Sequence, residues 1–161
     1  TVRTGARHTQ RVDEPLLWLH QAMTEHAEDY CTALFGWFIR ERDHVRFEFA
    51  TGGHPLPVLL RGGRAVTLGS PGVPLGLIDE PKLSRSEVAL ERGDILVFYT
   101  DGITDTRDRP LDDDALHELL LAVANPDPEK MGDAFMTRLR ELRATQEDDI
   151  ALLLVVAHDV T

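Results

Sequence analysis

The sequence predicts an α+β protein whose strands pair largely antiparallel. Short strand-like runs separated by turns that contain Gly or Asp follow one another between residues 32 and 99, which indicates consecutive hairpins. Two helix-like segments come next, and an apolar run at residues 150–157 returns to the sheet. Strands grouped before helices are typical of a sheet or two-sheet sandwich with helices on its outer faces.

The first part of the chain is predicted to be helical. Arg and His recur at spacings of three and four in residues 1–12, as in the tail of a helix whose beginning is missing. A second helix begins at Asp13, which we expect to act as its cap, with Pro15 in the first turn. Its apolar side chains Leu16, Leu19 and Met23 recur at helical spacing and predict an amphipathic helix on a core.

From Tyr30 the period becomes that of strands. The expected strands cover residues 32–39, 45–50, 58–61, 65–68, 86–90 and 95–99. We expect three hairpins, the last of which joins strands 86–90 and 95–99 through the turn at residues 91–94. The Gly- and Pro-rich segment 69–76 is too apolar for a linker, so we expect it to lie over the sheet.

Two further helices follow residue 105. Asp112, Asp113 and Asp114 precede a helix with Leu116, Leu119, Leu120 and Val123, and we interpret them as its charged first turn rather than as metal ligands. The second helix starts after Asn125-Pro126-Asp127-Pro128. Its predicted apolar stripe consists of Met131, Phe135, Leu139 and Leu142.

Length and charge limit the classes of function. A chain of 161 residues predicts one domain, and its longest apolar run of eight residues is too short to span a membrane. The net charge of −11 disfavours nucleic acid and anionic membranes as partners. The single cysteine, Cys31, cannot form an internal disulfide, which suits a reducing compartment and predicts a cytoplasmic location.

The strand at residues 95–99 stops at Thr100-Asp101-Gly102, which places a carboxylate at a strand end. Asp-Gly is also a common turn signal, so Asp101 alone would not indicate a site. A second acidic stretch, Glu147-Asp148-Asp149, directly precedes the last strand. If the two strands are neighbours, the two sets of carboxylates meet and could hold a hard divalent cation.

The chain contains five motifs in the order in which the bacterial PP2C-like serine phosphatases carry them. The sequence therefore resembles this family, in particular its sporulation and stress-response branch. The motifs are Thr51-Gly52-Gly53-His54-Pro55, Gly72-x-Pro74-Leu75-Gly76, Glu91-x-Gly93-Asp94, Tyr99-Thr100-Asp101-Gly102-Ile103-Thr104 and Asp148-Asp149-Ile150. The resemblance runs from about Val2 to Val156. It implies an α-β-β-α sandwich.

The resemblance also implies an activity, namely hydrolysis of phosphoserine or phosphothreonine on a protein by metal-bound hydroxide. Two Mn²⁺ or Mg²⁺ ions are expected in a complete domain, and no protein nucleophile is needed. Asp101 and Asp148 match the family's metal ligands and are the catalytic candidates. Asp149 is a further candidate at the metal, more as a support or a contact to water than as a direct ligand.

Other family features are expected by the same resemblance. The substrate would be a phosphorylated regulatory protein, such as an anti-sigma-factor antagonist, and a homodimer is left open. His54 is expected to be structural. Thr104 and Asp105 either order the loop or bind water near the site, or do neither.

One departure concerns the upstream acidic motif of the family, Gly-Asp-x-x-Asp, which has no counterpart before Asp101 in this chain. Three explanations are open. We expect first that residues 1–161 are a single PP2C-like domain lacking its N-terminal portion. The chain could instead be a non-catalytic binding module, or the resemblance could mark only the fold.

Overall fold

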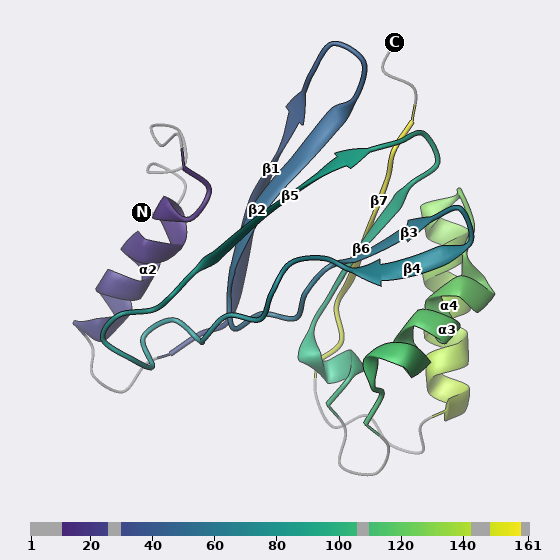
Figure 1. Cartoon of the computed structure of the whole chain (residues 1–161). Coiled ribbons are helices and arrows are strands. Elements are labelled where there is room, and N and C mark those ends of the chain that lie inside the picture. Colours follow the sequence, from purple (N-terminus) through teal and green to yellow (C-terminus); the bar gives the residue numbers. More distant parts are fainter. Residues whose placement is uncertain (1–10, 26–29, 106–109, 143–148, 159–161) are drawn as a thin grey trace. The chain divides into compact units, whose positions relative to one another are not determined.

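The computed structural model describes residues 11–25, 30–105, 110–142 and 149–158, which form antiparallel sheets with α-helices packed on them (Figure 1). In chain order the elements are α2 (Glu14–Thr24), β1 (Ala33–Arg40), β2 (Val45–Gly52), β3 (Val58–Arg61), β4 (Arg64–Thr67), β5 (Ser84–Leu90), β6 (Ile95–Tyr99), a 3₁₀ turn (Asp101–Ile103), α3 (Asp113–Val123), α4 (Pro128–Leu142) and β7 (Leu152–Val156). The elements divide into two compact units.

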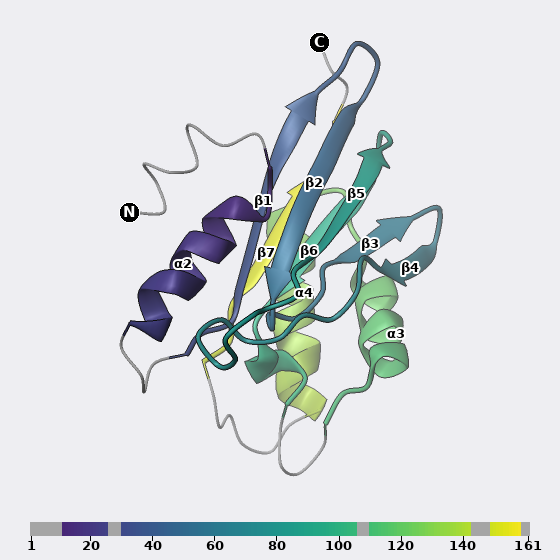
Figure 2. The ribbon, with the colours of Figure 1, turned by 60° about the vertical axis from the view of Figure 1, so that its left-hand side comes forward.

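The first unit contains α2 and a three-stranded sheet in the order β1-β2-β5. Helix α2 lies beside this sheet (Figure 2). Alternation along the strands sends Ala50 toward α2, where it packs with Val12, Leu16 and Leu75. Phe47 and Phe49 point to the other face and stack with ring centroids 5.0 Å apart. Neighbouring residues of β2 therefore pack on opposite faces of this sheet.

The predicted cap of α2 is wrong in its detail. Asp13 stands at the N-cap position, but its side chain accepts no hydrogen bond from the helix. Its carboxylate instead accepts two hydrogen bonds from Arg11, of which the Nη2 bond is 2.7 Å long. This contact lowers the pKa of Asp13 below its ordinary value. The predicted helix tail in residues 1–12 lies almost wholly outside the described residues.

The segment 69–76 packs against the strands of the first unit, as expected. Leu75 and Cys31 exchange backbone hydrogen bonds of 2.8 and 3.0 Å, and Leu75 is fully buried. A Cβ atom built on Gly72 would lie 2.5 Å from the carbonyl oxygen of Thr51, so only glycine allows this approach. His20 on α2 holds the next turn, because its ring accepts from the Gly76 amide at 3.0 Å.

The second unit contains a four-stranded sheet in the order β4-β3-β6-β7, with α3 and α4 against one face. Its core joins Val97 and Tyr99 of β6 to Leu120 of α3 and to Phe135 of α4. The Asp112 side chain caps α3 by accepting from the Ala115 amide at 2.9 Å, which confirms the predicted first turn.

Two sequence expectations are wrong. Strands β5 and β6 do not form a hairpin, because β5 pairs with β2 while β6 lies between β3 and β7 in the other sheet. Leu142 is 43% exposed and does not belong to the core stripe of α4. The helix continues to Leu142, so its apolar period extends past the last buried position at Leu139.

The predicted α+β class with mostly antiparallel sheets is confirmed. Among the described residues, no helix has both the length and the apolar character needed to cross a membrane.

Candidate metal site

Asp101 lies where β6 ends and the chain enters a 3₁₀ turn. Its side chain is exposed, and one carboxylate oxygen, Oδ1, accepts from the Gly102 amide at 3.1 Å. Its carbonyl oxygen accepts from the amides of Thr104 and Asp105 at 2.8 and 2.7 Å. The backbone of Asp101 is thus held by the turn, while its carboxylate remains open to solvent.

Asp149 lies beside this strand end, three residues before the neighbouring strand β7 begins. Strands β6 and β7 are antiparallel, with Tyr99 opposite Leu152. The pairing continues beyond β6, since the Thr100 amide donates to the carbonyl of Ala151 at 3.1 Å and the Thr100 hydroxyl donates to the carbonyl of Asp149 at 3.1 Å. Asp101 and Asp149 therefore lie at the same end of two adjacent strands.

Asp148, the other candidate ligand, lies outside the described residues. It precedes Asp149 directly in the sequence. Its predicted position beside Asp101 therefore stays a prediction.

The donor chemistry at these strand ends fits a hard divalent cation. Carboxylate and carbonyl oxygens are the ligands that Mg²⁺ and Mn²⁺ prefer, and the exposed Asp101 carboxylate can accept a cation without losing its hydrogen bond to Gly102. Within the described ranges, no group of three or more His, Cys, Asp or Glu side chains could hold a metal. On their own, Asp101 and Asp149 are too few to make a complete ligand set for such a cation.

His54, which the sequence analysis treats as structural, lies in the first unit. Its Nδ1 is 3.4 Å from the Thr32 hydroxyl, and its carbonyl accepts from the Thr51 hydroxyl at 3.1 Å. The preceding Gly53 has a φ of 73°, and a Cβ atom there would lie 2.6 Å from the nitrogen of Pro74. The Gly-Gly-His-Pro motif thus packs against the Gly72-to-Gly76 loop.

Thr104 forms hydrogen bonds with Asp101 and with Leu111. Its hydroxyl lies 3.3 Å from the carbonyl of Asp101, and its own carbonyl accepts from the Leu111 amide at 3.0 Å. Asp105 is exposed, and its amide closes the turn by donating to Asp101.

Sequence reasoning gave no role to Thr100. Its hydroxyl makes two hydrogen bonds across the strand ends, one to the Asp149 carbonyl and one from the Ala151 amide at 2.9 Å. The only local signal is a hydroxyl residue between a buried strand and Asp-Gly, and that pattern does not reveal a partner 51 residues away.

Known structures resemble this chain along most of its length. The phosphatase domain of the cell fate determinant SpoIIE from Bacillus subtilis, presoaked with Mn, superposes with a TM-score of 0.70 and 18% identity, covering 99% of this chain and 71% of that one. The RsbU and RsbW domains of a Mycobacterium tuberculosis protein give a TM-score of 0.79 and 23% identity, covering 99% of this chain and 46% of that one. The SiaA-PP2C domain of Pseudomonas aeruginosa gives 0.71 and 23%, covering 89% and 58%.

At these identities the structural likeness shows a shared PP2C-like fold. No curated protein matches the sequence. The sequence model of one family, described as stage II sporulation protein E (SpoIIE), matches residues 1–158. A match of this extent, on a chain with the PP2C-like fold, shows that the chain belongs to the SpoIIE family of phosphatase domains.

Proposed function

We propose that this chain is a metal-dependent protein phosphatase domain that removes phosphate from phosphoserine or phosphothreonine on a regulatory protein in the cytoplasm. The observation that carries the proposal is the placement of Asp101 and Asp149 at the same end of adjacent strands β6 and β7. Membership of the SpoIIE family supports phosphatase chemistry at such a site.

In the proposed site, Asp101 and Asp148 hold the cation through their carboxylates, and Asp149 supports the site or contacts water. Bound Mn²⁺ or Mg²⁺ would supply Lewis-acid chemistry, lowering the pKa of a water molecule and offsetting charge on the phosphoryl oxygens. The chain's own part is to orient the carboxylates. The 3₁₀ turn does this for Asp101, because three donors from residues 104 and 105 bind its carbonyl.

The proposed substrate is a phosphorylated regulatory protein of the anti-sigma-factor antagonist type. Two structural relatives support a regulatory role, since one carries RsbU and RsbW domains together and another is described as a key regulatory component of a secretion system. The net charge of −11 disfavours nucleic acid as an alternative partner.

The substitution Asp101→Asn tests the proposed activity. It keeps the shape of the side chain and removes the charge that would hold the cation, so we expect Mn²⁺-dependent phosphate release to fall on the order of 100-fold or more. The measurement uses purified protein with p-nitrophenyl phosphate and with a phosphorylated antagonist protein as substrates.

Asp114→Asn is the matched control, because it removes the same charge from an exposed position on α3 in the same unit. The control should keep the wild-type rate. An absence of activity in the wild type, or equal rates in the two variants, would refute the phosphatase proposal.

A second candidate is a protein-binding module without catalysis. It is favoured because the residues that the structure describes contain no group of three or more His, Cys, Asp or Glu side chains that could hold a metal. Calorimetric titration with Mn²⁺ separates the two candidates. A phosphatase domain should bind Mn²⁺ at a site that Asp148→Asn weakens, whereas a binding module should show no such site.

A further inference from the structure

The strand end that carries Asp101 has an unusual pattern of hydrogen bonds at Thr100. In a regular antiparallel ladder, the two residues of a hydrogen-bonded pair exchange two backbone N–H···O bonds. Thr100 and Ala151 form only one of them, in which the Thr100 amide donates to the Ala151 carbonyl at 3.1 Å. The Ala151 amide donates instead to the Thr100 hydroxyl at 2.9 Å.

The Thr100 carbonyl is used elsewhere. It accepts from the Ile103 amide at 2.9 Å, and this bond opens the 3₁₀ turn on which Asp101 lies. The hydroxyl thus replaces the carbonyl in the ladder, and so the carbonyl is available to the turn. One residue can continue the β6–β7 pairing and begin the turn at the same position.

The hydroxyl also fixes the neighbouring segment. Because its oxygen accepts from Ala151, its hydrogen is directed to the Asp149 carbonyl, 3.1 Å away. Both peptide groups that flank Ile150 are therefore tied to Thr100. The backbone of Asp149 is joined to the residue that immediately precedes Asp101.

We propose that Thr100 is a positioning residue of the candidate metal site, whose hydroxyl holds the backbone of Asp149 in place beside Asp101. This inference rests on the proposed function, in which Asp101 holds the cation and Asp149 supports the site or contacts water. Groups that orient metal ligands typically contribute 10–100-fold to metal affinity when they are removed.

Three substitutions separate the hydroxyl from the rest of the side chain. Thr100→Val keeps the branched shape and removes both hydrogen bonds, whereas Thr100→Ser keeps both bonds and loses only a methyl group. Thr100→Ala removes the hydroxyl without adding a methyl group, and it decides the question if the valine variant does not fold.

Thr67→Val is the matched structural control. The Thr67 hydroxyl lies 2.9 Å from Nε2 of His117 and joins β4 to α3 in the same unit, so this variant also loses one side-chain hydrogen bond. Thr67 lies on the edge strand β4, and β3 lies between β4 and β6. The control is therefore not on the strands that carry the candidate site. It should lower the melting temperature and leave Mn²⁺ affinity unchanged.

The experiment is a calorimetric titration of each purified variant with Mn²⁺, together with hydrogen exchange of the Ala151 amide measured by NMR. We expect Thr100→Val and Thr100→Ala to weaken Mn²⁺ binding about tenfold or more and to speed exchange at Ala151. Thr100→Ser should restore both to near the wild-type values.

The outcomes distinguish this inference from the proposed function. If Asp101→Asn abolishes Mn²⁺ binding but both hydroxyl-free variants bind like the wild type, Thr100 has only a structural role and the inference is wrong. If the wild type binds no Mn²⁺, or Asp101→Asn binds it equally well, the proposed function fails and the inference falls with it.

Discussion

At the residue scale, Tyr99 shows how packing changes the chemistry of a side chain close to the candidate site. It is the last residue of β6 and lies in the core of the second unit with an exposed fraction of 7%. Burial, and secondarily the charge of Asp113, raises the pKa of Tyr99 to about 12. The phenol therefore stays neutral in the folded protein where a free tyrosine ionises.

This pKa predicts a loss of stability in alkali. Above about pH 10 the unfolded Tyr99 releases its proton while the folded one keeps it, so the unfolded state binds fewer protons and the free energy of unfolding falls as the pH rises. The contribution is fully present below pH 10 and is lost by about pH 12, by at most about 3 kcal/mol. Urea unfolding at pH 8 to 11.5 measures it.

Tyr99→Phe is the comparison for this measurement, because other groups also titrate in alkali, including the Cys31 thiol, whose pKa is raised by burial. The phenylalanine variant should lose stability less steeply above pH 10 than the wild type does. Parallel curves for the two proteins would show that Tyr99 titrates normally.

The position of a candidate site residue could be predicted only where the neighbouring sequence shows which element the residue ends or begins. The strand-end placement of Asp101 could be predicted because a buried strand is followed by Asp-Gly, and that of Asp149 because it precedes another such strand. Thr100 could not, since its role depends on the amide of Ala151, and strand pairing at this distance is not written in local sequence.

At the element scale, the turn between β5 and β6 shows where local patterns fail. Residues 91–94 carry a hairpin signal, and Gly93 indeed has a φ of 86°. The turn is fastened to other strands, because Gly93 and Asp94 exchange backbone bonds of 2.9 Å with Ala157 after β7. Elements were therefore predictable from periodicity, whereas the sheet that each strand joins was not.

Asp94 is the side chain that secures this turn. Its carboxylate is 3% exposed and accepts from Arg61 at the end of β3, at 2.9 Å from Nε and 2.5 Å from Nη2. It also accepts from the Glu91 amide at 2.7 Å. A buried carboxylate with a two-pronged Arg partner is a stable arrangement only while both partners are present.

We expect Asp94→Asn to lower the free energy of unfolding by about 2–4 kcal/mol, because it removes the buried charge that pairs with Arg61 and leaves at least one donor unsatisfied. Arg61 keeps its contact with the exposed Glu91 at 3.0 Å. Urea denaturation measures the change. Glu141→Gln serves as control, since its ion pair with Arg138 is 3.2 Å long and more than half exposed on both sides, and it should cost less than about 1 kcal/mol. If Asp94→Asn lowers the free energy of unfolding no more than the control does, Asp94 does not stabilise this turn.

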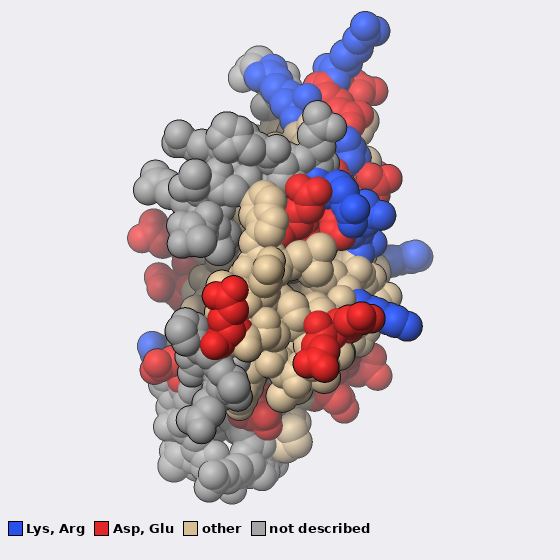
Figure 3. Space-filling view, turned by 90° about the vertical axis from the view of Figure 1, so that its left-hand side faces the viewer, with Lys and Arg blue, Asp and Glu red and all other residues tan. Residues whose placement is uncertain are grey.

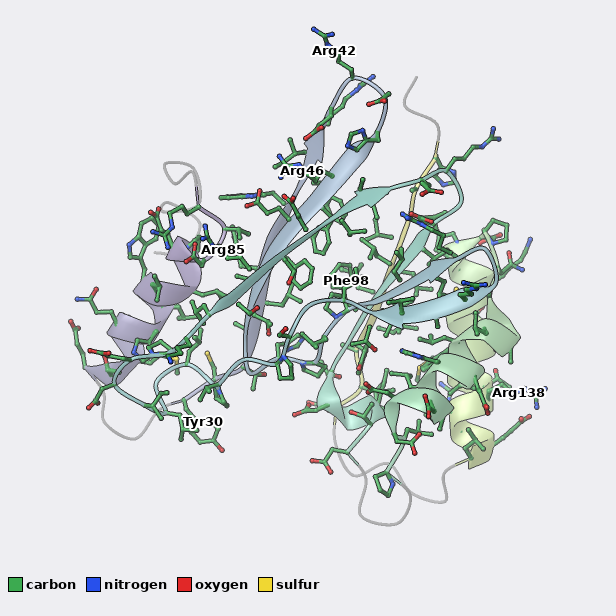
Figure 4. The ribbon with its side chains drawn as sticks, viewed as in Figure 1. Tyr30, Arg42, Arg46, Arg85, Phe98 and Arg138 are labelled. Carbon is green, nitrogen blue, oxygen red and sulfur yellow. The ribbon has the colours of Figure 1, made fainter. Side chains whose placement is uncertain are left out.

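At the scale of the whole molecule, the acidic surplus is partly neutralised by local ion pairs. Arg46 on β2 contacts Glu41, Glu48 and Glu87 at 2.8, 3.2 and 3.0 Å, on the sheet of the first unit (Figure 4). Acidic and basic side chains likewise lie next to one another on the face seen in Figure 3. The described part of that face shows no extended basic surface of the kind that binds a phosphate backbone.

Each of the two units has a core of its own. Leu75 is fully buried in the first unit and Phe135 in the second. The chain enters the second unit at residue 57, leaves it after residue 68 and returns at residue 91, so neither unit is a continuous stretch of sequence. When a discontinuous unit folds alone, the segment that belongs to the other unit becomes a long loop, and closing this loop costs entropy. This cost is smaller when both units fold together, because the loop is then itself folded.

We therefore expect residues 1–161 to unfold as one domain, as the sequence analysis predicts. Calorimetry should show a single transition whose calorimetric and van't Hoff enthalpies agree. Leu75→Ala and Phe135→Ala each remove a buried side chain, at a cost of about 2–5 kcal/mol, and each should shift the whole transition to lower temperature. Two transitions, with each variant lowering only one of them, would show instead that the units unfold separately, and the prediction of a single domain would be wrong.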